Sequence, residues 1–582
     1  MKTNRETGVL VGVIAIAFIL FGLLYRENQI KIESVVQEEK GSTTLSEWTV
    51  EESELNGVPL VEDKSIYEFD AGIHDVYINV FPTEDSAGNM LNFDSFDLHQ
   101  SRDHSYNPVL DCNIQILEAG QTLDPIIPTN VKNATIRVRG NSSRGDTYKS
   151  YKVKLEEDAK TFHGLSTFNI NKHSEDVMKV STKMCTDLLV DIPDITSFRT
   201  YFFRVWICDA SEPADQQKYR YYGLYTDIEQ PNKSYLTTRN LSDDAVMYKA
   251  SNFSFHMDEN LKNVTDEGYS QEAFEDVLSI REGTDHTKLL EMLADVNDET
   301  RDFQEIFDTY FNEENYLTWL AFNLLTGNDD IINHNFILYS PNNSKTWYFF
   351  AWDFDGALHY GDYESSLMKL PDSLKGGQKL NQNVLYRRYL QLPGSIEKIE
   401  KKMQTLLDDY ITEEKVNSLL AAYTPVLEET MPLYPDIELL EMPPNELDSY
   451  MYGVYDYMES NLEMFRYASQ FPRPMFLDKP KQNANNTVHF SWEPSYSYQG
   501  NTITYNLTVA DDYDMNHILL EEKGLAVPEY DSAISFEPGT YYLKVTAVDS
   551  KGNEQLNMER YETMLTDLKG LNVNGVLQFT VD

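Results

Sequence analysis

The chain has 582 residues and a formal net charge of −47, from 48 Lys and Arg against 95 Asp and Glu, which argues against nucleic acid as a partner because phosphate backbones are also negative. Hydrophobic residues make up 41% of the sequence, enough for a sizeable core, and this excludes a wholly disordered chain. The three cysteines, Cys112, Cys185 and Cys208, allow one bridge at most and exclude a disulfide scaffold.

The first predicted element is an apolar helix near the N-terminus. Residues 8–25 contain no charged side chain, and a helix of this length spans about 27 Å, close to the hydrocarbon core of a bilayer. No small-residue cleavage motif precedes Arg26, which favours an uncleaved anchor over a signal peptide. We therefore predict a transmembrane helix over residues 1–30, a Glu-, Ser- and Thr-rich stalk over 31–64, and a single-pass protein of the cell membrane whose body is extracellular.

Residues 65–471 are predicted to form one large α+β domain. Short runs of β-branched and aromatic residues, such as 134–138 and 202–207, predict strands up to about residue 270. Hydrophobic residues then recur at helical spacing, and two further strands are expected at 336–339 and 347–352.

The C-terminal region, residues 475–582, is predicted to be an all-β sandwich. Alternating segments such as 488–494 and 538–549, with one Trp early and Tyr residues late, are typical of this architecture. The region resembles a fibronectin type III module, and this resemblance implies a spacing or binding role.

Acidic and amide side chains gather between residues 327 and 356. Asp330 and Asn335 have the spacing D-x-x-x-x-N, and Asp353 ends an apolar strand, with Asp355 just beyond it. An Asp, an Asn and a hairpin Asp could converge on Mg²⁺ and phosphate oxygens, since Mg²⁺ prefers oxygen ligands. The structural alternative is a hairpin with capping carboxylates. Two carboxylates in one turn repel each other unless a cation lies between them, which favours the functional interpretation.

Basic residues form a second group between residues 137 and 155. A loop rich in Gly, Ser and Asn lies between basic strands and is a plausible phosphate cradle, although it is not a Walker P-loop. Lys152 and Lys154 alternate onto one strand face, and the alternative for them is an exposed sheet edge protected by lysines. Glu229 ends a later apolar strand and could pair with one of these lysines, or be a surface acid.

Three sequence blocks in this order resemble the CotH family of atypical secreted kinases, which is named from spore-coat proteins. The blocks are RGNSS…KSYKVKL, YGLYTDIEQPNKSYL and GNDD…NHNFILY…WYFFAWDFDGA. The resemblance covers roughly residues 65–470 and implies a divergent protein-kinase-like fold. It also implies binding of ATP with Mg²⁺ (or Mn²⁺) and phosphorylation of protein Ser or Thr, and the net charge favours basic substrates.

The resemblance also implies roles for individual residues. Asp330 matches the catalytic Asp and Asp353 the metal-binding Asp, with Asn335 and Asp355 as further metal ligands. The cofactor-binding candidates are Lys154 first, Lys152 second, Glu229 as their partner, and Arg144 in the loop. Family members often carry an aromatic residue at the position of Arg144.

Two other functions stay open on the sequence alone. The strand followed by Asp353, Asp355 and Gly356 also resembles the first motif of haloacid dehalogenases, which would make Asp353 the nucleophile and Asp355 the acid of a phosphatase. Against this, helices are expected after this motif, and not alternating strand–helix units. A non-catalytic binding or structural protein of the cell surface that kept the fold accounts equally well for the anchor, the stalk and the sandwich.

Overall fold

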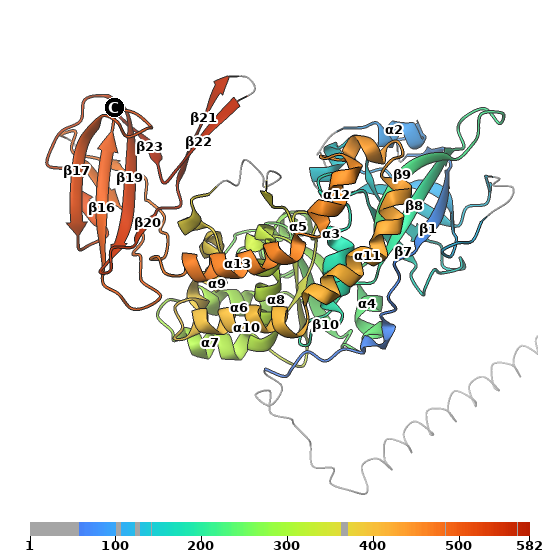
Figure 1. The fold of residues 1–582 in the computed structure, drawn as a ribbon, viewed down its shortest axis with the longest axis horizontal. Coiled ribbons are helices and arrows are strands. Elements are labelled where there is room, and N and C mark those ends of the chain that lie inside the picture. Colours follow the sequence, from blue (N-terminus) through green and yellow to red (C-terminus); the bar gives the residue numbers. More distant parts are fainter. Residues whose placement is uncertain are drawn as a thin grey trace, which may run out of the picture. The chain divides into compact units, whose positions relative to one another are not determined.

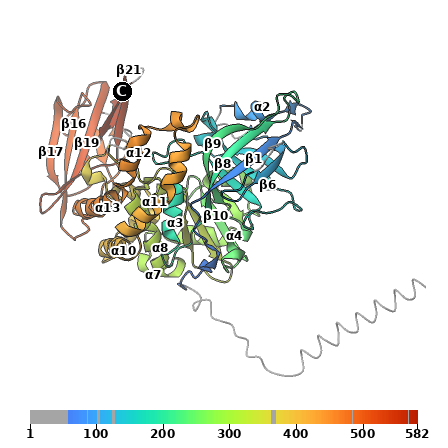
Figure 2. The ribbon, with the colours of Figure 1, turned by 45° about the vertical axis from the view of Figure 1, so that its right-hand side comes forward.

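The structure is a computed structural model that describes residues 57–582 except 86, 101–105, 123–127, 141, 362–369, 484 and 567–568 (Figures 1 and 2). The predicted transmembrane helix, residues 1–30, and the predicted stalk up to residue 56 lie outside the described residues. Within the described part, no helix has the length and apolar character needed to span a membrane.

Seven strands form a closed barrel in the N-terminal half, in the order β1–β4–β5–β6–β7–β9–β8. Their bounds are β1 (Ile73–Val80), β4 (Leu110–Ile116), β5 (Ala134–Arg139), β6 (Ser150–Leu155), β7 (Thr167–Asn171), β8 (Thr200–Asp209) and β9 (Arg220–Glu229). Only β1 and β8 pair in parallel. Apolar side chains of β5 and β6 fill the barrel, so the alternating residues Arg137, Arg139, Lys152 and Lys154 lie on its outer face.

A second sheet carries the hairpin that the sequence predicted. It is antiparallel, in the order β11 (Leu278–Glu282), β10 (Ala245–Ala250), β12 (Phe336–Pro341) and β13 (Tyr348–Ala351). Both faces are buried. Phe336 and Phe349 belong to the largest hydrophobic cluster, whereas Ile337 and Phe350 belong to another cluster on the opposite face.

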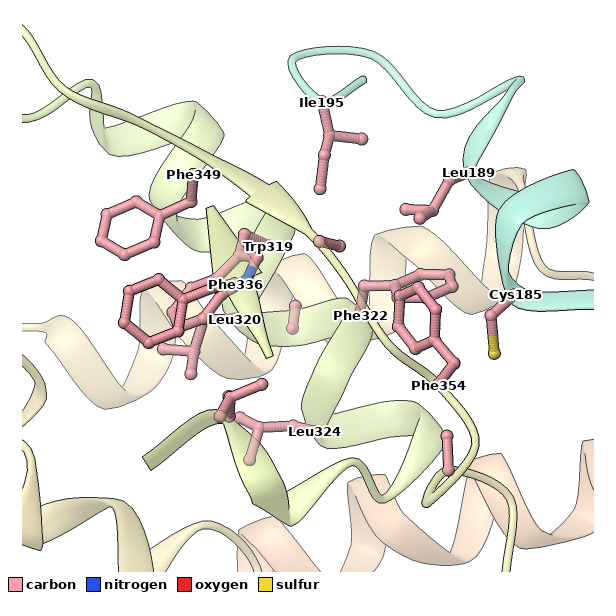
Figure 3. Packing of buried hydrophobic residues seen from close by; sticks show 14 of the residues in the cluster. Cys185, Leu189, Ile195, Trp319, Leu320, Phe322, Leu324, Phe336, Phe349 and Phe354 are labelled. Atoms are coloured by element: carbon pink, nitrogen blue, oxygen red, sulfur yellow. The ribbon is translucent and has the colours of Figure 1, made fainter. Parts of the chain in front are cut away.

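Helices pack around this sheet, and α8 (Glu313–Thr326) lies at their centre because its side chains are buried on every side from residue 315 onwards. The others are α2 (Phe93–Asp97), α3 (Ser181–Leu189), α4 (Lys233–Thr238), α5 (Gln271–Val277), α6 (Thr287–Val296), α7 (Phe303–Tyr310), α9 (Val384–Tyr389), α10 (Ser395–Asp409), α11 (Glu413–Thr430), α12 (Pro444–Met451) and α13 (Val454–Ala468). Figure 3 shows side chains of α8, α3, β12 and β13 sharing one core. The mixed α+β class predicted for this body is confirmed.

In the described residues of the C-terminal region, the regular elements are all strands, as predicted. They are β14 (Lys481–Gln482), β15 (Val488–Ser491), β16 (Ile503–Ala510), β17 (Ile518–Leu525), β18 (Glu529–Asp531), β19 (Gly539–Asp549), β20 (Glu554–Leu556), β21 (Arg560–Thr566), β22 (Lys569–Asn574) and β23 (Leu577–Val581). One sheet is β14–β15–β18 and the other β17–β16–β19–β20, with β23 beside β19. Residues of both sheets, including Phe490 and Val545, share one core. The finer resemblance to fibronectin type III stays a prediction.

Residues 57–64, the last part of the predicted stalk, pack on the body. Leu60 is 8% exposed and lies in the same cluster as Ile337 and Phe350. These residues therefore do not extend as a free stalk, because burial of Leu60 holds the segment on the second sheet.

Candidate functional site

Asp330 follows the end of α8. The helix ends at Gly327, whose φ of 67° is left-handed, and a Cβ there would lie 2.1 Å from the hydroxyl oxygen of Tyr457. The short 3₁₀ turn Asp329–Ile332 then presents Asp330. Between them, Asn328 donates from Nδ2 to the backbone oxygen of Asp353 at 3.3 Å. The α8 end and the loop after β13 are therefore joined.

Asp353 and Asp355 lie in the loop after β13. Between them, Phe354 is 1% exposed and packs edge-on against Phe322 of α8, with ring centroids 5.6 Å apart (Figure 3). The backbone of Asp353 has a φ of 63°, a conformation that costs energy for a residue other than Gly. The buried ring anchors the loop, and the two carboxylates beside it stay partly exposed.

The predicted acidic residues converge. Asp330 Oδ2 lies 3.5 Å from the point where a Cβ on Gly356 would stand, which places it beside the loop that carries Asp353 and Asp355. Burial raises the pKa of Asp355 well above its usual range, and the negative charges of Asp353 and then of further carboxylates raise it more. Among the described residues, the side chains of Asp353 and Asp355 have no hydrogen bond or ion pair.

Asp330, Asp353 and Asp355, together with two carboxylates that were not predicted, are here called the acidic cluster. Asp176 and Glu175 precede α3, and their charges also act on Asp355. Neighbouring His173 is 6% exposed, and its Nε2 has no hydrogen-bond partner among the described residues. Burial lowers the pKa of His173, and the charges of Asp176 and Asp353 oppose this effect. No spacing rule links residues 173–176 to residue 353, so only the fold reveals this contribution.

Asp330 is held in its ionised form. Its pKa is lowered, first by the side chain of His334, whose Nε2 lies 3.6 Å from Asp330 Oδ2. The positive charges of Lys379 and His359 act in the same direction. Asp330, Asp355 and Lys379 line a cavity of about 870 Å³. The carboxylate is thus available to accept a proton from a group that enters this cavity.

Asn335 lies next to the hairpin that carries Asp353. Phe336 of β12 pairs with Ala351 of β13, so Asn335 and Asp353 leave the hairpin at the same end. Asn335 is 6% exposed and has a φ of 60°. The strand pairing therefore places Asn335 at the end of the sheet from which the Asp353 loop leaves, and its role as a metal ligand stays a prediction.

A row of cations extends from the acidic cluster. Lys249 of β10 and Arg139 of β5 belong to this row, and Asp353 is the charge that most favours the protonated form of each. Burial nevertheless lowers the pKa of Lys249 to about 8 and also lowers that of Arg139. Lys249 was missed, although a lysine inside the apolar strand Ala245–Ala250 was a visible signal.

The row continues outwards through Arg281, Arg137 and Lys152 to Lys154. Burial lowers the pKa of Lys152 to about 8, with further lowering by Arg137 and Arg281. Burial and Arg139 lower the pKa of Arg281 to about 10. Lys154, the first choice for the phosphate lysine, is exposed at the outer end. Among the described residues, no carboxylate forms an ion pair with any of the six cations in this row.

The predicted partnership of Glu229 with a strand lysine is wrong. Glu229 accepts hydrogen bonds from Arg199 and Arg239, each at 2.6 Å, and Lys152 instead donates to Gln230 Oε1 at 2.9 Å. The reason is the strand register. Glu229 pairs with the barrel-core residue Phe168, so it faces away from the outer surface that carries Lys152.

The prediction that Arg144 binds the cofactor is also corrected. Arg144 is 5% exposed, and its guanidinium donates to the backbone oxygens of Val138 at 3.2 Å and Tyr106 at 2.8 Å. The guanidinium therefore stabilises the loop between β5 and β6 through these hydrogen bonds to backbone oxygens.

The donor set is compatible with a divalent cation. Among the described residues, the only three His, Cys or carboxylate side chains whose ligand atoms all lie within 4.8 Å of one another are Asp511, Asp512 and His517, far along the chain in the C-terminal region. No three carboxylates of the acidic cluster meet this distance limit among the described residues. An ion at the acidic cluster would therefore be held by no more than two of these carboxylates, which is common for Mg²⁺ when phosphate oxygens supply the other ligands.

Comparison with known proteins identifies the family. The family described as "CotH kinase protein" matches residues 136–438, more than half of the chain, and this range includes every site residue predicted above. The "Inner spore coat protein H" of Bacillus subtilis (strain 168) is 22% identical over 357 residues, which cover 58% of this chain and 90% of that protein. This chain therefore belongs to the CotH family.

Proposed function

We propose that this chain is a protein kinase that transfers the γ-phosphate of ATP to Ser or Thr of a protein substrate with the help of Mg²⁺ or Mn²⁺. One observation carries the proposal: in the described part of the chain, a row of cations without carboxylate ion pairs leads to Asp353 and Asp355, whose side chains have no ion pair either. In a chain with a net charge of −47, basic side chains would find acidic partners unless the site were built for an anion. The family description supports this interpretation.

In this proposal the acidic cluster holds the metal. Asp353 is the first ligand, and Asp355 and Asn335 are the further oxygen donors. A bound divalent cation would supply charge neutralisation at the transferring phosphoryl group. The mutual repulsion that raises the pKa of Asp355 is then relieved by the ion.

The cation row would hold the triphosphate. The charge of Asp353 acts on Lys249 and Arg139, which therefore suit the phosphates next to the metal, whereas Arg137, Arg281 and Lys152 continue the row. One guanidinium group can donate two parallel hydrogen bonds to a phosphate. Partial burial of the arginines in this row strengthens each of these charged hydrogen bonds. Lys154 contributes least, because it is exposed.

Asp330 would act as the base. Its carboxylate accepts the proton of the substrate hydroxyl while the oxygen–phosphorus bond forms and the bond to the β-phosphate of ATP breaks, so that ADP leaves. The lowered pKa keeps Asp330 ionised at neutral pH, and the cavity of about 870 Å³ beside it is open to a substrate side chain.

The test measures nucleotide binding and phosphate transfer separately. Asp330→Asn should lower transfer from radiolabelled ATP by about 100-fold or more and leave ATP binding intact. Lys249→Met should weaken ATP binding itself, whereas Lys160→Met, at an exposed position outside the row, is the matched control. Absence of nucleotide uptake by the wild-type chain with either metal would contradict the proposal.

A non-catalytic coat or surface protein is the second candidate, because the relative is described as a spore coat protein. ATP binding without transfer would favour it. The phosphatase alternative needs alternating strand–helix units after Asp353, but β13 ends an antiparallel sheet and helices follow. An extracellular or coat location with a single-pass anchor is part of the proposal, and the anchor itself falls in residues outside the described part.

A further inference from the structure

Residues 57–67 are here called the strap. Hydrogen bonds join them to the body along their length. Their first half contacts α8 and β13. Asn312 donates from Nδ2 to the backbone oxygens of Gly57 at 2.8 Å and Val58 at 3.2 Å. Tyr348, the first residue of β13, donates its hydroxyl to the same Val58 oxygen at 2.7 Å. The strap therefore joins the beginnings of two elements.

These two elements carry the proposed catalytic and metal residues at their other ends. Asn312 is the N-cap of α8, and the last residue of the helix, Thr326, lies four residues before Asp330. β13 begins at Tyr348 and ends two residues before Asp353. A shift of either element along its axis would therefore move its carboxylate by the same distance, because helices and strands are stiff over this length.

The second half of the strap contacts the end of α3. Lys64 donates from Nζ to the backbone oxygens of Val190 at 2.7 Å and Ile192 at 2.6 Å, just beyond the C-terminal end of the helix. At the opposite end, Ser181 donates its backbone N–H to Asp176 Oδ2 at 2.9 Å. A third member of the acidic cluster is thus also connected to the strap through one rigid element.

A buried charge network locks the strap in place. The hydroxyl of Tyr67 has two acceptors in reach of its one proton, Glu62 Oε2 at 2.7 Å and the Ser197 backbone oxygen at 2.8 Å, and it accepts from Arg239 Nε at 2.9 Å. Arg239 is completely buried and also binds Glu229. The carboxylate that the sequence suggested for the nucleotide therefore anchors the strap instead.

We propose that the strap is a positioning segment, which holds α3, α8 and β13 in register at the ends remote from the acidic cluster and so keeps Asp176, Asp330 and Asp353 converged. This inference rests on the proposed function for its effect on transfer. Residues 57–64 of the strap were predicted to be the end of the stalk, and their contacts with the body give them this positioning role instead.

The first experiment loosens the strap in the full chain. Leu60→Ala combined with Tyr67→Phe removes one buried contact and one junction of hydrogen bonds, and Val61→Ala is the control because Val61 is 74% exposed on the same segment. We expect kcat to fall about tenfold or more, since small misplacements of catalytic groups are costly. Amide hydrogen exchange should speed up in β13 and in the first turn of α8, but not in β5 or β6.

The second experiment restores the strap as a separate peptide. A protease site inserted between Glu68 and Phe69, both exposed, allows the folded full chain to be cut and the strap to be exchanged. A synthetic peptide of residues 55–68 should restore both kcat and the slow exchange of β13. The same peptide with L60A and Y67F should not.

Two outcomes would overturn the proposal. One is a cut chain without strap that keeps the full kcat and the original exchange of β13. The other is faster exchange in the barrel strands to the same degree, which would mean general destabilisation and no positioning. If the uncut wild type transfers no phosphate, the proposed function fails, while the exchange and rescue measurements still decide whether the strap positions α8 and β13.

Discussion

Two sets of charges in this molecule, one buried and one partly buried, differ in how they are paired. Around Arg239, Glu229 accepts hydrogen bonds from two arginines and Tyr67 completes the network. At the acidic cluster, the side chains of Asp353 and the nearby Lys249 form no hydrogen bond or ion pair among the described residues. Buried charges are expensive unless they are compensated, so the first set contributes to the folded state, whereas the second is arranged for a ligand that brings its own charges.

The largest effect should come from breaking the paired set. Glu229→Gln leaves the guanidinium of Arg239 buried without its main carboxylate, and we expect the free energy of unfolding to fall by about 3–5 kcal/mol. Denaturant unfolding at neutral pH measures this. Glu521→Gln is the control, because its pair with Lys523 is exposed and is worth about 0.5 kcal/mol or less. Equal losses in the two variants would contradict the comparison.

The unpaired set should show the reverse pattern. Asp353→Asn removes the proposed first metal ligand, and we expect transfer activity to fall by about 100-fold or more. The melting temperature should stay the same or rise, because one of several repelling carboxylates is gone. Activity assays and thermal unfolding of the same preparation test this. A variant that loses activity and stability together would place Asp353 with the structural charges.

Asp227 in the barrel tests the cost of an uncompensated carboxyl. It is completely buried, its oxygens lack hydrogen-bond partners of normal geometry among the described residues, and burial raises its pKa to about 8. Asn169 and Arg139 offset this only in part, and the charge of Glu229 adds to it.

The sign of the pH effect follows from this raised pKa. The stability contributed by protonated Asp227 is fully present below its ordinary pKa near 3.8 and is lost as the pH rises to about 8. As the pH rises from 5 to 8, the free energy of unfolding of Asp227→Asn should therefore increase by at least about 2 kcal/mol relative to that of the wild type. Denaturant unfolding across this range measures the gain, and parallel pH profiles for both chains would contradict it.

The smallest effect is expected at Lys152, in the outer part of the cation row. The pKa of Lys152 is lowered to about 8, so this group is charged below that pH and loses its charge as the pH rises through it. We expect the affinity for ATP, measured by calorimetry, to fall about threefold to tenfold between pH 7 and pH 9. Lys152→Arg should flatten this dependence, because arginine stays protonated. An unchanged slope would remove Lys152 from the phosphate site.

Much of this site was open to prediction from local sequence. The D-x-x-x-x-N spacing and the apolar strand before Asp353 led to residues that the fold brings to one place, because a helix end and a hairpin are short-range features. The roles of Glu229 and Arg144 were predicted incorrectly. Both depend on which strand face a residue occupies and on partners such as Arg239, which patterns in a single strand do not contain.

The amino-acid sequence by itself determined the α+β class of the body, the all-strand C-terminal region and the candidate carboxylates, because hydrophobic periodicity and turn residues act over a few positions. Only the tertiary structure decided that the charge of Asp353 acts on Lys249 and Arg139, that Asp176 joins the acidic cluster, and that residues 57–67 pack on the body. Those contacts join residues far apart in the chain, and closure of the barrel and packing of the helices are what bring them together.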